Sequence, residues 1–202
     1  MRKTLGEMTL EELWQLFPIF LTEHKREWQG WYTEEEQRLR EELGKAAYNQ
    51  MGAAIDQSIR ISHIGSTTIA TIWAKPIIDI LIEIPQDTDW ESIKHSIEFC
   101  GYNCMNKSDN RASFCRGYTI DGFAERVFHV HLRRFGDHNE LYFRDYLMEH
   151  PEVAKEYEGL KLKLWKKYEH NRDAYTESKT ELISKYTELA KIKYQGRYDV
   201  IQ

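Results

Sequence analysis

The stretch from Pro76 to Pro85 constrains the fold of this chain most strongly. Between the two prolines, isoleucine and leucine are interrupted by Asp79 and Glu83. Because β-branched residues favour strands and proline ends them, the run predicts a strand that is buried on both faces. A carboxylate inside such a strand is costly unless a cation or a metal ion pairs with it. The sequence therefore predicts a central strand that carries an acid with a partner.

The pattern around this strand changes from helical to mixed and back to helical. Thr9 with Glu12, and Thr33 with Glu36, have the spacing of capping boxes and predict two N-terminal helices. Alternation predicts further strands at 58–64, 102–105, 113–120 and 126–134, with a helix at 89–100 between them. Pro151 begins one C-terminal helix, and residues 172–194 form the last. We therefore expect one domain over residues 1–202, an α/β or α+β fold with a small mixed β-sheet, N-terminal helices (1–56) and C-terminal helices (138–195).

Composition excludes several classes of protein. With 202 residues, a net charge of −5 and a pI near 5.9, the chain is unsuited to gripping a nucleic-acid backbone. Its three cysteines lack the spacing of a zinc site, and no basic-then-apolar leader precedes the first helix. No apolar run approaches the ~18 residues of a membrane span. We expect a cytoplasmic protein with reduced cysteines and no membrane partner.

A glycine–serine turn follows the strand predicted at 58–64. At Gly65-Ser66 the backbone N–H groups and the serine hydroxyl are placed to bind a phosphate. Asp79 follows on the next strand, and Mg²⁺ prefers carboxylates together with phosphate oxygens. The two features predict a nucleotide–Mg²⁺ site. The alternative is that Asp79 is a structural acid bonded to Lys75 or to Ser66.

Several motifs resemble the GrpB family, small bacterial proteins placed in the nucleotidyltransferase superfamily, whose fold is shared with DNA polymerase beta. The family pattern of a His-Ile-Gly-Ser-Thr turn and a later Ala-Lys-Pro-x-x-Asp-Ile is seen at 63–67 and 74–80. Further matches lie at 143–147, at 150–154, at Tyr157, at Leu160-Lys161, and at Tyr175 with Lys179. The resemblance covers roughly residues 25–190. It implies a mixed sheet of the nucleotidyltransferase type.

The resemblance also implies site residues. The turn residues Gly65, Ser66 and Thr67 would contact the nucleotide, and Asp79 with Ser66 would be catalytic. The superfamily's second metal-binding acid would stand at position 81, where this chain has leucine. Its third acid comes from a later strand, which here offers His129 and His131. One ion held by Asp79, Glu83 and a histidine is the substitute, and histidine ligation would favour Mn²⁺ or Zn²⁺ over Mg²⁺.

Basic and flanking residues leave more alternatives open. The planar guanidinium groups of Arg133, Arg134 and Arg144 are suited to clamp a triphosphate, or are solvated surface arginines. Lys75 either contacts a phosphate or supports the loop before Pro76. Lys179, one helical turn after Tyr175, would approach the nucleotide under the family interpretation. Glu83 is either a ligand or a solvated strand end, and His63 either lines the site or packs at the end of its strand.

These expectations combine into an enzyme that transfers a nucleoside monophosphate from a nucleoside triphosphate (NTP) to a small-molecule or protein acceptor, with Mg²⁺ or Mn²⁺. The missing acids support an alternative: a catalytically inactive protein that binds a nucleotide or phosphometabolite. Because a GrpB-like domain is also found fused to dephospho-CoA kinase in some bacteria, the resemblance links that alternative to cofactor metabolism. A third hypothesis is a partner-binding protein in which the pocket is a relic.

Overall fold

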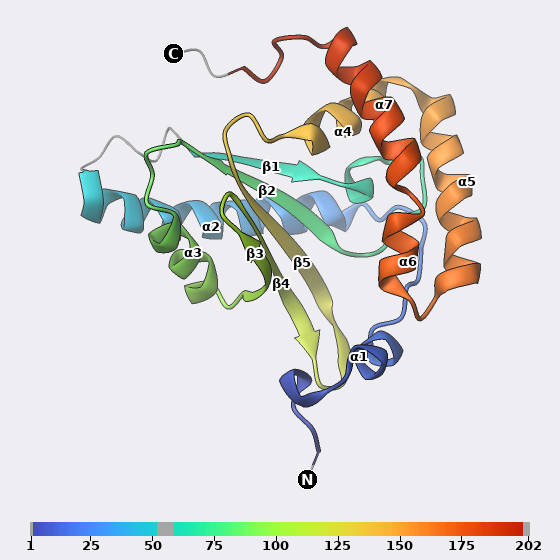
Figure 1. Cartoon of the computed structure of the whole chain (residues 1–202), viewed down its shortest axis with the longest axis horizontal. Coiled ribbons are helices and arrows are strands. Elements are labelled where there is room, and N and C mark those ends of the chain that lie inside the picture. The colour runs from blue at the N-terminus through green and yellow to red at the C-terminus, as the bar shows by residue number, and fades with distance from the viewer. Residues whose placement is uncertain (1, 52–58, 200–202) are drawn as a thin grey trace.

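A five-stranded mixed sheet forms the centre of the computed structural model, which describes residues 2–51 and 59–199 (Figure 1). The strand order is β1-β2-β5-β4-β3. Only the β2–β5 pair is parallel, and the other pairs are antiparallel. The expected mixed sheet is confirmed; Ser58, the expected start of the first strand, lies outside the described residues. The strands are β1 (Arg60–Ile64), β2 (Ile78–Ile84), β3 (Asn103–Ser108), β4 (Arg111–Thr119) and β5 (Gly122–Arg134).

Alternation along β2 sends its side chains to two different environments. Ile78, Ile80, Ile82 and Ile84 are fully buried and join the largest apolar cluster of the described residues. This cluster includes side chains of α2 (Glu27–Met51) and α3 (Trp90–Phe99), so these two helices cover that face. Asp79, Leu81 and Glu83 alternate with the isoleucines and therefore belong to the opposite face.

Of the C-terminal helices, α4 packs on this opposite face, whereas α5, α6 and α7 lie beside the sheet (Figure 1). Leu141 of α4 packs against Ile64 and Leu81. A second apolar cluster joins α4, α5 and α7 to the loop that follows β1, through residues that include Leu147, Tyr157 and Tyr186. The helices are α4 (Asn139–Glu149), α5 (Pro151–Tyr168), α6 (Arg172–Glu177) and α7 (Thr180–Lys193).

The N-terminal segment packs against the tip of the β4–β5 hairpin. It contains a short 3-10 helix, Leu5–Glu7, and α1 (Leu10–Leu16). Thr9 and Glu12 form the expected capping box of α1. Phe17, just after α1, packs on Tyr118 and Phe123 with ring centroids 4.7 and 5.1 Å apart. This contact fixes the end of the hairpin that carries Tyr118.

Two of the expected helix boundaries are wrong. Thr33 caps no helix, because α2 begins at Glu27 and the Thr33 hydroxyl donates to the carbonyl of Gln29 one turn earlier. Residues 172–194 form two helices instead of one, with a break at Ser178 and Lys179. None of the described helices combines the length and hydropathy of a membrane span.

Candidate functional site

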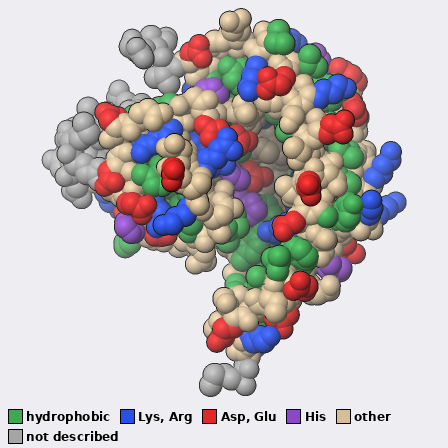
Figure 2. Space-filling view, viewed as in Figure 1, with side chains coloured by type: hydrophobic (Ala, Val, Ile, Leu, Met, Phe, Trp, Pro, Cys, Tyr) green, Lys and Arg blue, Asp and Glu red, His purple; other side chains and the backbone are tan. Residues whose placement is uncertain are grey.

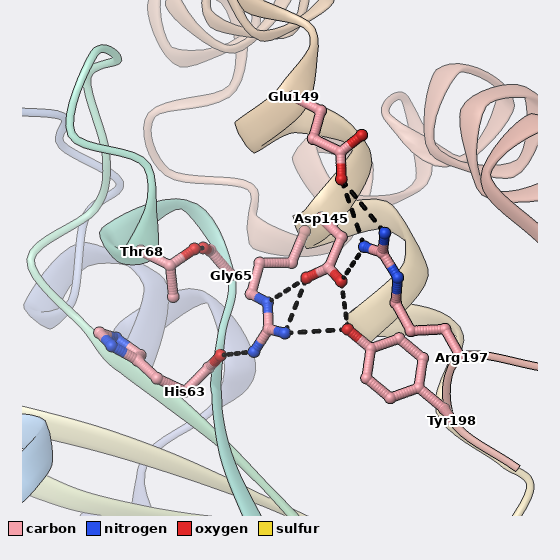
Figure 3. A network of polar contacts seen from close by, with 8 residues as sticks. His63, Gly65, Thr68, Asp145, Glu149, Arg197 and Tyr198 are labelled. Carbon is pink, nitrogen blue, oxygen red and sulfur yellow. Dashed lines mark hydrogen bonds and ion pairs between the residues drawn. The ribbon is translucent and has the colours of Figure 1, made fainter. Parts of the chain in front are cut away.

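The turn after β1 is built around Gly65, whose φ of 76° lies in the left-handed region that favours glycine. A 3-10 helix, Ser66–Thr68, follows it. The backbone N–H and the hydroxyl of Thr68 both donate to the Gly65 carbonyl, at 3.2 and 2.7 Å. Figure 3 shows Gly65 and Thr68 beside the end of β1. Hydrogen bonds within the turn therefore fix its conformation.

His63 holds this turn in place instead of lining the site. Its Nε2 lies 2.9 Å from the hydroxyl of Thr67, and its ring stacks on Tyr32 with centroids 4.6 Å apart. Burial lowers the pKa of His63 to about 4, so the ring is neutral at neutral pH. The Thr67 hydroxyl is thus engaged with His63, although Thr67 still lines the neighbouring cavity.

Asp79 lies directly against the turn. A Cβ atom placed on Gly65 would lie 2.5 Å from Oδ2 of Asp79, so only glycine leaves room for this carboxylate. Ser66 lines the same cavity as Asp79. The structure therefore brings together Gly65, Ser66 and Asp79, as the sequence predicts.

Two imidazoles complete a cluster around Asp79. Asp79 is paired across the parallel β2–β5 ladder with His129, and His131 lies two residues further on the same face. Nδ1 of His129 and Nε2 of His131 each lie 3.4 Å from Oδ1 of Asp79. One ligand atom from each of the three residues falls within 4.8 Å of the others, and they are the one such group found among the described residues.

The charges in this cluster are strongly coupled. Burial would raise the pKa of Asp79, but hydrogen bonds to His129 and His131 outweigh it and hold that pKa well below its usual range. Burial lowers the pKa of His129, although Asp79 opposes this effect. At neutral pH the cluster thus offers an ionised carboxylate together with a neutral His129 ring, the forms that bind metal ions.

Tyr118 orients one of the imidazoles. Its hydroxyl lies 2.9 Å from Nε2 of His129, and its ring is stacked on the histidine at 5.8 Å. A metal-binding histidine is usually held through its second nitrogen in this way, because that contact fixes the tautomer and the ring orientation. The donor set of one carboxylate and two imidazoles fits Mn²⁺ or Zn²⁺ better than Mg²⁺, which prefers oxygen ligands.

A cavity of about 310 Å³ opens beside this cluster. We call it the cationic cavity, because Lys75, Lys161, Arg172 and Lys179 line it together with the turn and Asp79. Figure 2 shows a hollow between the sheet and the C-terminal helices, with histidine and acidic side chains at its floor. The structure therefore brings Lys179 to the turn and Asp79, as the resemblance implies, and of the two alternatives for Lys75 it places that lysine in the cavity lining.

A second cavity of about 320 Å³ shares Ser66 and Asp79 with the first. We call it the apolar cavity, since Phe143, Leu147 and Ile183 line it. Tyr157 lines both cavities. Burial raises the pKa of Tyr157 to about 12, while a hydrogen bond with Ser66 opposes the rise. The two cavities meet at the turn and the carboxylate.

The expectation that Glu83 shares an ion with Asp79 is not met. Glu83 is fully buried and accepts two hydrogen bonds from Arg60, at 2.6 and 2.7 Å. Nδ1 of His138 lies 2.9 Å from the same carboxylate. Glu83 is therefore neither a metal ligand nor a solvated strand end but the centre of a buried ion cluster, and these partners keep its pKa low although burial opposes them.

The three arginines expected to clamp a triphosphate are bonded to the protein. Arg133 is buried and donates to the carbonyls of Ala112 and Leu132. Arg134 donates to the carbonyls of Pro85 and Thr88. Neither lines the cationic or the apolar cavity, so the structure corrects both assignments.

Arg144 does reach the apolar cavity, but its guanidinium is engaged. It binds Asp145 through two nitrogens, at 2.9 and 2.7 Å, and donates to the carbonyl of His63 at 2.8 Å. Figure 3 shows Asp145 between these contacts and the side chains of Arg197 and Tyr198. Arg144 thus ties α4 to the end of β1, next to the turn.

Three residues of the site are not predicted as binding or positioning groups by the sequence. Lys161 belongs to the Leu160-Lys161 motif, and that motif was the signal available for it. Arg172 precedes Tyr175 by three residues, one helical turn away in α6, which offered a weaker signal. Nothing in the local pattern marks Tyr118, because its partner His129 lies across the hairpin.

The comparisons with known proteins decide the family. The family model described as "GrpB protein" matches residues 18–189. The chain belongs to the GrpB family. It is 33% identical over 177 residues to the UPF0157 protein YqkA of Bacillus subtilis, covering 86% of this chain but 48% of YqkA. This GrpB chain therefore spans about half the length of that relative.

Two further comparisons agree with this assignment. The UPF0157 protein PA4798 of Pseudomonas aeruginosa is 32% identical over 169 residues, which cover 78% of this chain and 69% of that protein. The crystal structure of the conserved protein GrpB from Enterococcus faecalis superposes with a TM-score of 0.69 at 28% identity, covering 87% of this chain and 99% of that chain. The GrpB fold thus extends over most of this chain.

Proposed function

We propose that this GrpB chain transfers a nucleoside monophosphate from an NTP to a hydroxyl or amine of a small-molecule or protein acceptor. The observation that supports the proposal is the convergence of the Gly65-Ser66 turn with Asp79, His129 and His131 beside two cavities. A phosphate-binding turn next to a metal-binding cluster is the minimum that such a transfer requires.

Asp79, His129 and His131 would hold one Mn²⁺ or Zn²⁺ ion, with Mg²⁺ a poorer match to two imidazoles. The bound ion supplies charge neutralisation at the phosphate that reacts. Ser66 and the turn amides orient that phosphate, and Tyr118 holds His129 in position. The acceptor oxygen or nitrogen then forms a bond to the α-phosphorus, the bond to the β-phosphate breaks, and pyrophosphate leaves.

The Asp79 carboxylate lies at the junction of both cavities, so it can accept a hydrogen bond from an acceptor that enters through either one. Because its pKa is held low, Asp79 orients the acceptor, and the acceptor's proton passes to water. The apolar cavity, with the ring of Phe143 and the amide of Asn139 in its lining, has a surface suited to the nucleoside.

The test is release of pyrophosphate from ATP or GTP in the presence of Mn²⁺, Zn²⁺ or Mg²⁺ and a mixture of cell metabolites and proteins. The wild-type chain should release pyrophosphate, whereas Asp79→Asn should not. Equal release by the two proteins would exclude the proposed reaction.

A second function is favoured by a specific observation. Leu81, where the second acid of the superfamily would stand, is fully buried against Ile64 and Leu141 and leaves no polar group there. A protein that binds a nucleotide or phosphometabolite without turnover needs no second acid. NTP binding without pyrophosphate release under any metal condition would support this function over the first.

A further inference from the structure

We infer that the cationic cavity binds a polyphosphate group directly through Lys75, Lys161, Arg172 and Lys179, without a metal ion. The inference rests on the proposed function, because it names the part of the ligand that this side of the site recognises. It also goes beyond that function, since metal-dependent binding of an NTP does not require such a site.

The four cations reach the cavity from separate parts of the fold. Lys75 precedes β2, Lys161 lies on α5, Arg172 begins α6, and Lys179 stands at the break between α6 and α7. The ring of Tyr175 holds two of them, with Nζ of Lys75 at 4.4 Å and Nζ of Lys179 at 4.3 Å from its centroid. Two lysine side chains therefore meet at one aromatic ring.

The cations have little negative charge to neutralise them. Asp79 is the one acidic residue among the described residues that line this cavity, and it is already engaged with His129 and His131. Glu158, near Lys161, already accepts hydrogen bonds from Lys155 and from the backbone of Trp73. In addition, Nε of Arg172 is buried without a hydrogen-bond partner among the described residues. Lys161 donates to the carbonyl of Trp73, but the lining still sets four basic side chains against a single carboxylate.

The titration behaviour of the lysines agrees with this imbalance. Burial, reinforced by the charge of Lys179, lowers the pKa of Lys161 to about 7. Burial lowers the pKa of Lys179 to about 8. Burial together with the neighbouring Lys179 and Arg172 places the pKa of Lys75 well below its ordinary value. An anion bound in the cavity would raise the pKa values of these lysines, because a nearby negative charge favours their protonated form.

A polyphosphate fits these features better than other anions. A monoanion would neutralise only one of the four basic side chains, whereas a chain of phosphates carries several negative charges. The hydroxyls of Ser66 and Thr176 lie in the same lining and can donate to phosphate oxygens.

The experiment is calorimetric titration of the full chain with inorganic tripolyphosphate in buffer that contains EDTA. We expect one molecule to bind per chain, and we expect Lys179→Met and Lys161→Met each to weaken binding at least tenfold. The matched controls are Lys163→Met on α5 and Lys185→Met on α7, both at exposed positions, and these should bind as the parent does. Thermal unfolding checks that each variant is folded.

Three results would overturn the inference. The first is that tripolyphosphate does not bind in EDTA, and the second is that it binds only after Mn²⁺ or Zn²⁺ is added. The third is that the control variants weaken binding as much as the cavity variants do. If Lys161→Met does not fold, Lys179→Met decides, because Lys179 is less buried, and Lys179→Arg should keep binding within about threefold of the parent. Tripolyphosphate binding without pyrophosphate release from any NTP would reject the proposed reaction and keep this site. The converse, metal-dependent turnover without binding in EDTA, would reject this site alone.

Discussion

Gly65 packs so closely against Asp79 that only the hydrogen of a glycine fits between them, since a Cβ on residue 65 would lie 2.5 Å from the Asp79 Oδ2. Asp79 lies on β2, and Gly65 directly follows β1, whose last residue Ile64 is opposite Asp79 in the antiparallel pair. The position of the carboxylate and the conformation of the turn therefore depend on each other.

The substitution Gly65→Ala tests this dependence. It should displace the Asp79 carboxylate and place alanine at a φ of 76° with an extended ψ, a conformation that is essentially restricted to glycine and costs about 1–3 kcal/mol for a residue with a Cβ. We expect at least roughly tenfold weaker metal binding and a lower unfolding temperature. The control is Gly159→Ala, in α5 with no atom within 4 Å of the new Cβ, which should stabilise the helix by about 0.5–1 kcal/mol. Unchanged metal binding in Gly65→Ala would contradict the account.

The buried Glu83 predicts a stability effect rather than a functional one. Glu83→Gln leaves Arg60 and His138 without their carboxylate and should lower the free energy of unfolding by about 3 kcal/mol at pH 7. The folded-state pKa of Glu83 is lowered, so this contribution is complete above the unfolded pKa and disappears as the pH falls through the folded pKa. Urea unfolding of both proteins at pH 7 and pH 4 measures the difference.

The control for this prediction is Asp121→Asn, which breaks the exposed pair with Arg2 and should cost less than about 1 kcal/mol. A Glu83→Gln variant as stable as the parent would show that the buried cluster contributes nothing to stability. Retained metal binding in Glu83→Gln is also expected, because Glu83 lies outside the group of Asp79, His129 and His131.

Because the pKa of Lys161 is lowered, we expect the free energy of unfolding to rise with pH. The unfolded chain holds the Lys161 proton up to about pH 10.4, whereas the folded chain releases it near its lowered pKa of about 7. Between pH 7 and pH 9 the unfolded state therefore binds more protons, so the free energy of unfolding should increase. Lys75 and Lys179 act in the same direction.

The comparison is between the parent and Lys161→Met, by urea unfolding at pH 7 and pH 9 without added anions. The increase should be smaller in Lys161→Met than in the parent by about 1 kcal/mol or more, since one pKa unit corresponds to about 1.4 kcal/mol. Equal increases in both proteins would mean that Lys161 keeps its ordinary pKa in the folded chain.

Tyr118 predicts a positioning effect on metal binding. Tyr118→Phe removes the hydroxyl that lies 2.9 Å from Nε2 of His129 but keeps the ring that packs on Phe17. Loss of such a supporting contact typically weakens metal affinity by about 10–100-fold. Titration with Mn²⁺ and Zn²⁺ measures the effect, and Tyr102→Phe, whose hydroxyl instead binds Glu35, should leave affinity unchanged. Equal affinities in all three proteins would remove Tyr118 from the site.

Local patterns predicted much of the sheet and part of the site. The isoleucines of β2 and the alternation of His129 and His131 placed Asp79 and both histidines correctly on the sheet, because strand periodicity depends only on neighbouring residues. The Gly65-Ser66 turn was likewise visible, since glycine marks the backbone conformation that the turn requires.

Long-range partners could not be predicted in the same way. Glu83 was expected to bind metal or face solvent because Arg60 and His138, which bury it, are distant in sequence. Arg133 and Arg134 were expected at the phosphates because their carbonyl partners lie on other segments. The break at Lys179 also escaped the helical periodicity, although it brings Lys179 onto the ring of Tyr175.

The most direct measurement is the metal content and metal affinity of the purified chain and of three single variants. The parent should bind one equivalent of Mn²⁺ or Zn²⁺, and Asp79→Asn and His131→Ala should each lose that equivalent. His95→Ala, at an exposed position on α3, should bind as the parent does. If Asp79→Asn binds the same ion with the parent's stoichiometry and affinity, the cluster of Asp79, His129 and His131 is not a metal site and the proposed reaction has no centre.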